Sequence, residues 1–129
     1  MIHVVDTHAL LWYLEGSNRL SDPARGVLAT SLDPLVVPAI VLGEARYAID
    51  RKRTTVTWDE LLGAIAGDHR FHVHPLDLDI LRRLPVGLEM HDAIICATAA
   101  AYQEASGEAV PLISKDRRIR DSGLVQTVW

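Results

Sequence analysis

The stretch IHVVDT (residues 2–7) decides the fold of this chain. A short β-branched run ends there in a carboxylate, Asp6, and a helical pattern begins at once over residues 8–14. A strand that carries an acid at its carboxyl end and continues into a helix is typical of open parallel sheets, where ligands bind beyond the strand ends. Asp6 is therefore the first candidate functional residue, although Asp6 or Thr7 would also serve as a cap of the following helix.

Short apolar runs alternate with helical patterns along the rest of the chain. Further strands are predicted at residues 35–37, 70–75, 110–114 and 125–129, and helices at 24–32, 39–49, 58–66, 76–84, 91–106 and 117–123. This alternation predicts an α/β fold in which helices cover both faces of a central, mostly parallel sheet of four to five short strands. Because there is no linker, repeat or low-complexity segment, residues 1–129 are expected to form a single domain.

Composition restricts the functions that are open to the chain. No stretch approaches the roughly 18 to 20 uninterrupted apolar residues of a membrane span, and the N-terminus lacks the pattern of a signal peptide. A soluble, cytoplasmic protein is therefore expected. The one cysteine, Cys96, excludes an internal disulfide and a multi-thiolate metal site. Its neighbours Ile95 and Ala97 favour a small buried hydrophobe.

The basic residues gather in two places although the net charge is −4. An acidic chain is not an obvious binder of nucleic acid, because affinity for nucleic acid depends mainly on neutralising phosphates. The first cluster comprises Arg46, Arg51, Lys52 and Arg53, and the second comprises Lys115, Arg117, Arg118 and Arg120. These clusters are either solvated helix ends or two patches that flank an anionic substrate.

Three further acids stand at informative positions. Glu44 lies within an apolar helix that is expected to be buried on more than one side, where a carboxylate needs a cation, an ion pair or hydrogen bonds. Asp92 lies in the first turn of an alanine-rich helix, where it is either a cap or a ligand of a cation. Asp116 follows the strand at residues 110–114, just as Asp6 follows the first strand.

These four acids would form one site if their strands and helices meet at the same edge of the sheet. Two carboxylates about 4 Å apart repel by roughly 4 kcal/mol at an effective dielectric of 20, so such a cluster binds cations or protonates. All-oxygen ligation suits Mg²⁺ or Mn²⁺, which support phosphodiester hydrolysis. Thr7 and Ser114 would donate hydrogen bonds to a metal ligand or a phosphate. Arg46, Lys115 and Arg117 would hold the flanking phosphodiester backbone.

The ordered set of motifs resembles a PIN-domain protein of the VapC toxin type. The motifs are Asp6-Thr7 after a strand, Glu44 in the third helix, Asp92 in DAIICATA, and Ser114-Lys115-Asp116 after a late strand. The resemblance runs from residue 2 to about residue 128 and implies a three-layer α/β/α PIN-like fold. It also implies a Mg²⁺- or Mn²⁺-dependent endoribonuclease, the toxin of a type II toxin-antitoxin pair, inhibited by an antitoxin that covers the acidic pocket.

Residue roles follow from the same resemblance. It implies that Asp6, Glu44, Asp92 and Asp116 are the catalytic, metal-binding acids, and that the protein forms a homodimer. Ser114 stands where the family commonly has threonine or serine. Ala93 departs from the family, because many relatives carry arginine after the third acid, and a contact from that arginine is not expected here.

Three other functional interpretations, and one further candidate metal site, remain open at this stage. His72, His74 and His91 would provide metal-free acid and base groups for RNA cleavage, which leaves a cyclic phosphate and survives EDTA. His72 and His74 also share a strand face and would suit a metal such as zinc, although no third ligand is evident. A receiver-like signalling module would use the acids to hold Mg²⁺, but residues 5–7 lack the usual pair of acids. The third is a PIN-like fold that binds RNA or a partner without cutting.

Overall fold

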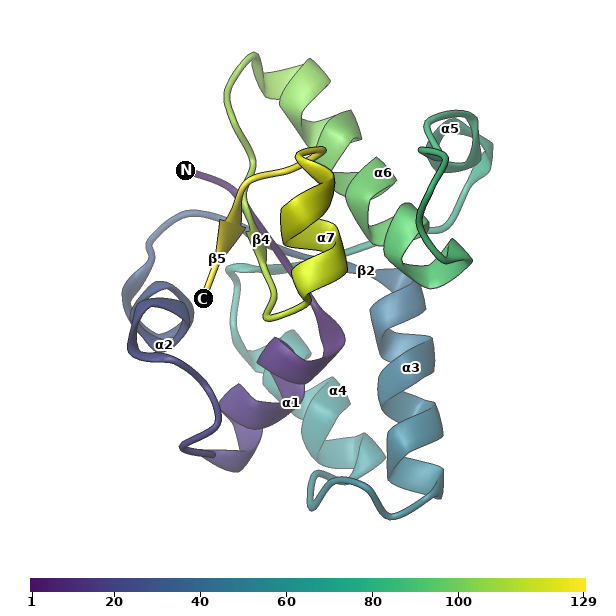
Figure 1. Cartoon of the computed structure of the whole chain (residues 1–129). Helices are drawn as coiled ribbons and strands as arrows, with labels where there is room; N and C mark the ends of the chain where they lie inside the picture. Colours follow the sequence, from purple (N-terminus) through teal and green to yellow (C-terminus); the bar gives the residue numbers. More distant parts are fainter.

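The computed structural model describes residues 1–129 and contains one five-stranded sheet in which every strand pair is parallel (Figure 1). The strands are β1 (His3–Val5), β2 (Leu35–Pro38), β3 (Phe71–His74), β4 (Leu112–Ile113) and β5 (Thr127–Val128). The helices are α1 (Thr7–Glu15), α2 (Asp22–Thr30), α3 (Ala39–Asp50), α4 (Trp58–Gly67), α5 (Leu78–Arg82), α6 (Met90–Ser106) and α7 (Arg117–Ser122). The predicted α/β architecture is confirmed.

The strand order β3-β2-β1-β4-β5 places the first strand at the centre of the sheet. The chain moves outward in one direction from β1 to β3 and then crosses to β4 and β5 on the other side. Because parallel crossovers are right-handed, this reversal puts α1, α2 and α4 on the opposite face from α6 and α7. The carboxyl ends of β1 and β4 and the amino ends of α1 and α7 therefore lie at one edge.

The register of β1 and β4 brings two sequence motifs side by side. Val5 pairs with Ile113, and the amide of Asp6 donates to the Ile113 carbonyl at 3.1 Å. The next residues along the two strands, Asp6 and Ser114, therefore leave the sheet at the same level. The distant motifs of the sequence meet here because the strands that carry them are neighbours.

The core surrounds the central strands, and helices α1 to α4, α6 and α7 all contribute buried residues to it. Val4, Val5, Val36 and Val37 are fully buried in the sheet, and the alanine-rich helix α6 is buried from residue 93 to residue 99. Small side chains allow α6 to pack closely against β1 and β2, and Gly107 ends the helix with a φ of 72°. Cys96 is buried in this helix, and burial raises the pKa of its thiol to about 12, which confirms a packing role.

Two expectations differ from the structure. Helix α3 buries only Val41 and Ala45, whereas burial on more than one side was expected; Tyr47 is 55% exposed. Helix α3 contacts α1, α6 and β2, and Ile40, Leu42, Ala48 and Ile49 pack against the core but are only partly buried, because the helix lies at the border of the core. Strand β4 spans only Leu112–Ile113 of the expected residues 110–114, because it pairs with its neighbours β1 and β5 over two residues on each side. No helix has the length and apolar character required to span a membrane.

Candidate active site

A cleft of about 780 Å³ opens at the carboxyl edge of the sheet, between α1, α3, the start of α6 and the segment after β4. All four acids singled out in the sequence line it: Asp6, Glu44, Asp92 and Asp116. They come from four separate elements that the topology brings to one edge. The predicted convergence on one cleft is therefore observed, and the surroundings of each acid define what the cleft can do.

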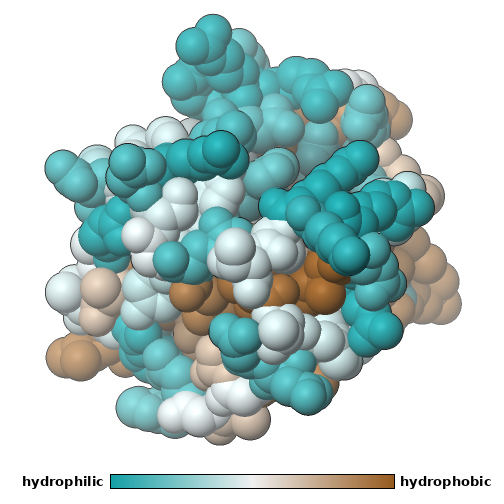
Figure 2. Space-filling model, turned by 90° about the horizontal axis from the view of Figure 1, so that it is seen from below, coloured by the Kyte–Doolittle hydropathy of each residue, from teal (hydrophilic) through white to brown (hydrophobic).

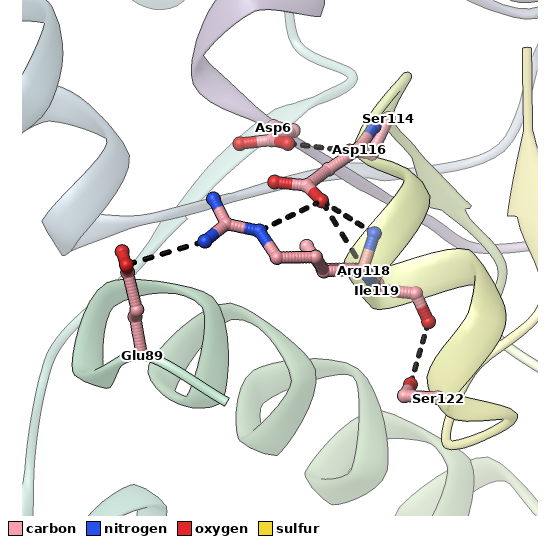
Figure 3. Close-up of polar contacts among 7 residues, drawn as sticks. All are labelled: Asp6, Glu89, Ser114, Asp116, Arg118, Ile119 and Ser122. Atoms are coloured by element: carbon pink, nitrogen blue, oxygen red, sulfur yellow. Dashed lines mark hydrogen bonds and ion pairs between the residues drawn. The ribbon is translucent and has the colours of Figure 1, made fainter. Parts of the chain in front are cut away.

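Asp6 is held by two hydrogen bonds at the end of β1. The hydroxyl of Ser114 donates to its Oδ2 at 2.6 Å (Figure 3). The amide of Thr7 donates to its Oδ1 at 2.7 Å. Asp6 therefore also caps α1, as the alternative interpretation required. Burial raises the pKa of Asp6, and the hydrogen bonds from Ser114 and Thr7 lower it only in part. The carboxylate is therefore held in one orientation, and its charged form is disfavoured by burial.

Glu44 is oriented by a side chain from the first helix. The Thr7 hydroxyl donates to Glu44 Oε1 at 2.9 Å, and Nδ1 of His91 lies 3.4 Å from Oε2. Thr7 is buried, so this hydrogen bond connects the start of α1 to the middle of α3 across the cleft. Thr7 and Ser114, predicted as donors to a metal ligand or a phosphate, thus each donate to an acid of the cleft.

Asp92 is the acid whose negative charge is least offset by hydrogen bonds and cations. It lies in the first turn of α6, but the helix is capped at Glu89 and no side chain supplies a capping hydrogen bond. Burial, the largest cause, and the charges of Asp116, Asp6 and Glu44 together raise the pKa of Asp92 to about 6, against a smaller opposite effect of Arg118. The four acids thus act on one another as a single electrostatic cluster.

Asp116 combines a capping role with a position in the cleft. Its Oδ1 accepts hydrogen bonds from the amides of Arg118 at 2.8 Å and Ile119 at 3.4 Å, which starts α7. The Arg118 guanidinium lies 3.8 Å from the same oxygen and forms an ion pair with Glu89 at 3.2 Å (Figure 3). Arg118 thereby spans the mouth of the cleft between α7 and α6.

The basic residues divide between the cleft and the outer surface. Lys115 lines the cleft with its Nζ 4.6 Å from the ring of Trp12, and Arg53 and Arg118 also line it. Arg46 does not: it pairs with Asp50 at 3.2 Å and stacks on a neighbouring aromatic ring. Arg117 is also absent from the lining. Of the three predicted RNA-binding residues, the cleft therefore includes Lys115 alone.

Sequence reasoning missed several residues that line the cleft. On α1 they are His8, Leu11, Trp12 and Glu15, and on α3 they are Ile40, Gly43, Tyr47 and Ala48. On α1, Leu11, Trp12 and Glu15 lie three, four and seven residues after His8, which is the spacing of one helical face. On α3, Ile40 lies four residues before Glu44, and Tyr47 and Ala48 lie three and four residues after it, so the position of Glu44 in the sequence could have identified this face.

The histidines of the alternative mechanism are scattered. His91 and His8 line the cleft, whereas His72 and His74 lie on β3, away from it. Nδ1 of His74 contacts the Tyr102 hydroxyl at 3.0 Å, which is an ordinary packing contact between a strand and α6. The trio His72, His74 and His91 therefore does not come together.

The donor set of the cleft fits a hard divalent cation. Four carboxylates supply only oxygen ligands, and Asp92 has its charge opposed mainly by other acids. No three acidic, histidine or cysteine side chains are close enough here to form a ready-made metal site. Mutual repulsion between the acids favours such separation until a cation offsets their charge.

Comparison with known proteins identifies the family. Residues 3–123 match the PIN domain family. Because the match covers almost the whole chain, the protein belongs to the PIN domain family, as the motifs suggested. No curated protein sequence matches the chain significantly.

Solved structures resemble the chain over its full length at low sequence identity. A toxin-antitoxin complex from Klebsiella pneumoniae has a TM-score of 0.68 and 19% identity, covering 98% of this chain and 96% of that one. VapBC2 from Rickettsia felis, bound to a promoter DNA fragment, has a TM-score of 0.65 and 12% identity, covering 98% and 97%. The sarcin-ricin loop cleaving toxin VapC20 from Mycobacterium tuberculosis has a TM-score of 0.61 and 18% identity, covering 100% of both chains. These likenesses confirm the fold.

Proposed function

We propose that the protein is a Mg²⁺- or Mn²⁺-dependent endoribonuclease of the VapC type, the toxin of a toxin-antitoxin pair. The observation that carries the proposal is the gathering of Asp6, Glu44, Asp92 and Asp116 around one cleft in a PIN-domain fold. All three structural neighbours described above are toxins or toxin complexes, and one is an RNA-cleaving toxin. The family match favours this class over a receiver-like signalling module.

The four acids would hold the cation through their carboxylate oxygens. When bound, such an ion lowers the pKa of a water molecule and stabilises negative charge on the leaving oxygen of a phosphodiester. Ser114 keeps Asp6 in one orientation, and Thr7 does the same for Glu44, so the orientation of these two ligands is set before an ion binds. This orientation is what the chain itself contributes to the chemistry.

The basic residues of the cleft would place the substrate. Lys115 and Arg118 stand beside the acids and offer positive charge to the phosphates on either side of the scissile bond. Arg118 is already tied to Glu89 and Asp116, which fixes its position at the mouth of the cleft. An unpaired substrate is favoured, because bases of a single strand can be splayed into a narrow cleft.

A cognate antitoxin and a second copy of the chain are the expected protein partners. Two of the structural neighbours are complexes of a toxin with its antitoxin. An antitoxin segment that carries a basic side chain would neutralise the acidic cleft and block access of RNA to it. Homodimer formation is expected from the resemblance to VapC-type proteins.

The experiment that tests the proposal is cleavage of single-stranded RNA by the purified protein. Cleavage is expected with Mg²⁺ or Mn²⁺, with 5′-phosphate products, and is expected to stop with EDTA, in Asp6→Asn and in Asp92→Asn. Cleavage that continues in EDTA and leaves a cyclic phosphate would instead support the histidine mechanism. If the folded, metal-loaded protein cuts no RNA, the proposal is contradicted. The interpretation as a PIN-like protein that binds RNA or a partner without cutting would then be favoured.

A further inference from the structure

A second cleft adjoins the acidic one. It has a volume of about 340 Å³ and no hydrophobic residue in its lining. Glu15, Arg53 and Thr54 line both clefts, so the two are continuous. Arg19 and Lys52 lie in the second cleft only, and its other side chains are hydroxyls. A polar hollow with three cations therefore leads directly out of the site that holds the four acids.

The three cations of the second cleft are not neutralised by carboxylates. Arg46, Arg70 and Arg83 elsewhere in the protein form ion pairs with nearby acids, whereas Arg19, Lys52 and Arg53 form none. The only acid of the cleft, Glu15, accepts a hydrogen bond from the Thr54 hydroxyl and so stays on the wall of the cleft. A net positive charge remains available to an anionic ligand.

The backbone at Lys52 supports a role for its side chain. Lys52 has a φ of 54°, in the left-handed region, and is the only residue other than glycine there. It follows the C-terminal end of α3, and its amide donates to the Ile49 carbonyl at 3.0 Å. Glycine is the residue usually found at this position after a helix. A lysine held in a strained conformation beside a cleft is a feature of functional sites.

An aromatic side chain connects the two clefts. The Arg19 guanidinium lies 5.8 Å from the ring of Trp12, and Lys115 lies 4.6 Å from the same ring. Trp12 lines the acidic cleft, so cations from both clefts meet on it. Positive charge that follows a groove, together with aromatic rings, is the usual composition of a surface that binds single-stranded nucleic acid.

The surrounding surface also suits a charged ligand. Helices α1 and α4 and the C-terminal end of α3 lie at the lower end of the molecule in Figure 1. Figure 2 shows the molecule from this side: apolar atoms gather in the central hollow and hydrophilic side chains surround them. The second cleft itself has no hydrophobic residue in its lining, so it differs from an apolar groove for a partner helix.

We propose that the second cleft binds backbone phosphates of the single-stranded RNA whose scissile bond lies in the acidic cleft, an inference that rests on the proposed endoribonuclease function. Four acids repel a polyanion, so the substrate needs a positive region next to them. Arg19, Lys52 and Arg53 provide it on the side of the cleft formed by the C-terminal end of α1 and the segment after α3. Their contacts would set the position of the strand and contribute little base specificity.

The test measures binding of a labelled single-stranded RNA of mixed sequence to full-length protein in the Asp6→Asn background, where cleavage is blocked. Lys52→Gly and Arg19→Gln are each expected to weaken binding several-fold at low salt. Each is also expected to reduce the slope of log affinity against log salt by about 0.7 to 1. Lys52→Gly is the sharper variant, because glycine fits the backbone there and keeps or raises the melting temperature.

Arg82→Gln is the matched control, since Arg82 is an exposed arginine on α5, outside both clefts. It is expected to leave affinity and salt slope unchanged. Equal RNA binding by the background protein, Lys52→Gly and Arg19→Gln would overturn the inference. Polyglutamate serves as a probe for an acidic protein segment. If these variants lose polyglutamate binding but keep RNA binding, the second cleft binds such a segment and the inference is overturned.

Wild-type cleavage in the same preparation separates this inference from the proposed function. If the wild type cuts RNA while the cleft variants bind it normally, the endoribonuclease stands and the second cleft is not its binding site. If the wild type cuts nothing while the cleft variants lose RNA affinity, the second cleft binds RNA and the proposed reaction is wrong.

Discussion

At the scale of single residues, the charge of Asp92 is the most informative quantity in the cleft. Its folded-state pKa of about 6 lies above the ordinary value of 3.8, so the folded protein keeps this proton to higher pH than the unfolded chain does. The resulting stability is present at low pH and is lost as pH rises from about 4 to about 6. Charge in this cleft therefore works against the fold at neutral pH.

Asp92→Asn is expected to raise the melting temperature of the metal-free protein at pH 7. It should also flatten the decline in stability between pH 4 and 6, because it removes one charge from the cluster. Thermal unfolding in EDTA across this pH range measures both effects. Asp121→Asn is the control, since Asp121 is exposed and pairs only with Arg120. A lower melting temperature for Asp92→Asn at pH 7 would contradict the electrostatic argument.

Ser114→Ala tests the hydrogen bond that orients Asp6. Ser114 is buried, and its hydroxyl donates to Asp6 Oδ2 and accepts from the amide of Asp116 at 3.1 Å. Its removal is expected to cost about 1.5 to 3 kcal/mol of unfolding free energy, because a buried carboxylate loses a donor. Urea denaturation measures the change, with the exposed Ser106→Ala as control. A loss equal to that of the control would show that the bond contributes nothing.

At the scale of elements, packing around α6 limits which residues the helix can carry. Ala97 is 1% exposed and packs with Ile80 and Ile94 in a small second core. Ala97→Leu is expected to destabilise the protein by about 1 to 3 kcal/mol through overpacking, whereas Ala105→Leu on the exposed end of the same helix should change little. Urea denaturation of both variants tests this. If Ala97→Leu is as stable as Ala105→Leu, there is free space beside Ala97, and the close packing around α6 is wrong.

The sequence predicted the type of nearly every element but not which helix faces meet. Alternating apolar runs mark the strands locally. Ser21, Thr57 and Asp77 accept backbone hydrogen bonds as caps of α2, α4 and α5, so these helix starts are also determined by local sequence. The orientation of α3 depends on distant partners. The exposure of Tyr47 and the position of Arg46 outside the cleft therefore could not be read from local pattern.

At the scale of the whole molecule, the strand order explains why acids far apart in the sequence share one cleft. Strand β1 lies between β2 and β4, so the segments that follow these strands start from one edge. The motif order predicted this convergence, but the second cleft could not be predicted. It depends on how the end of α1 and the turn after α3 approach each other, and no local sequence signal reports that distance.

The central claim is that the four acids form one binding site for a divalent cation. The most direct measurement is the shift in melting temperature on titration with Mn²⁺, in the wild type and in Asp6→Asn, Glu44→Gln, Asp92→Asn and Asp116→Asn. A saturable rise in the wild type and a reduced or absent rise in each variant are predicted, because only the folded cleft binds the ion. A full rise in all four variants, or none in the wild type, would contradict the claim.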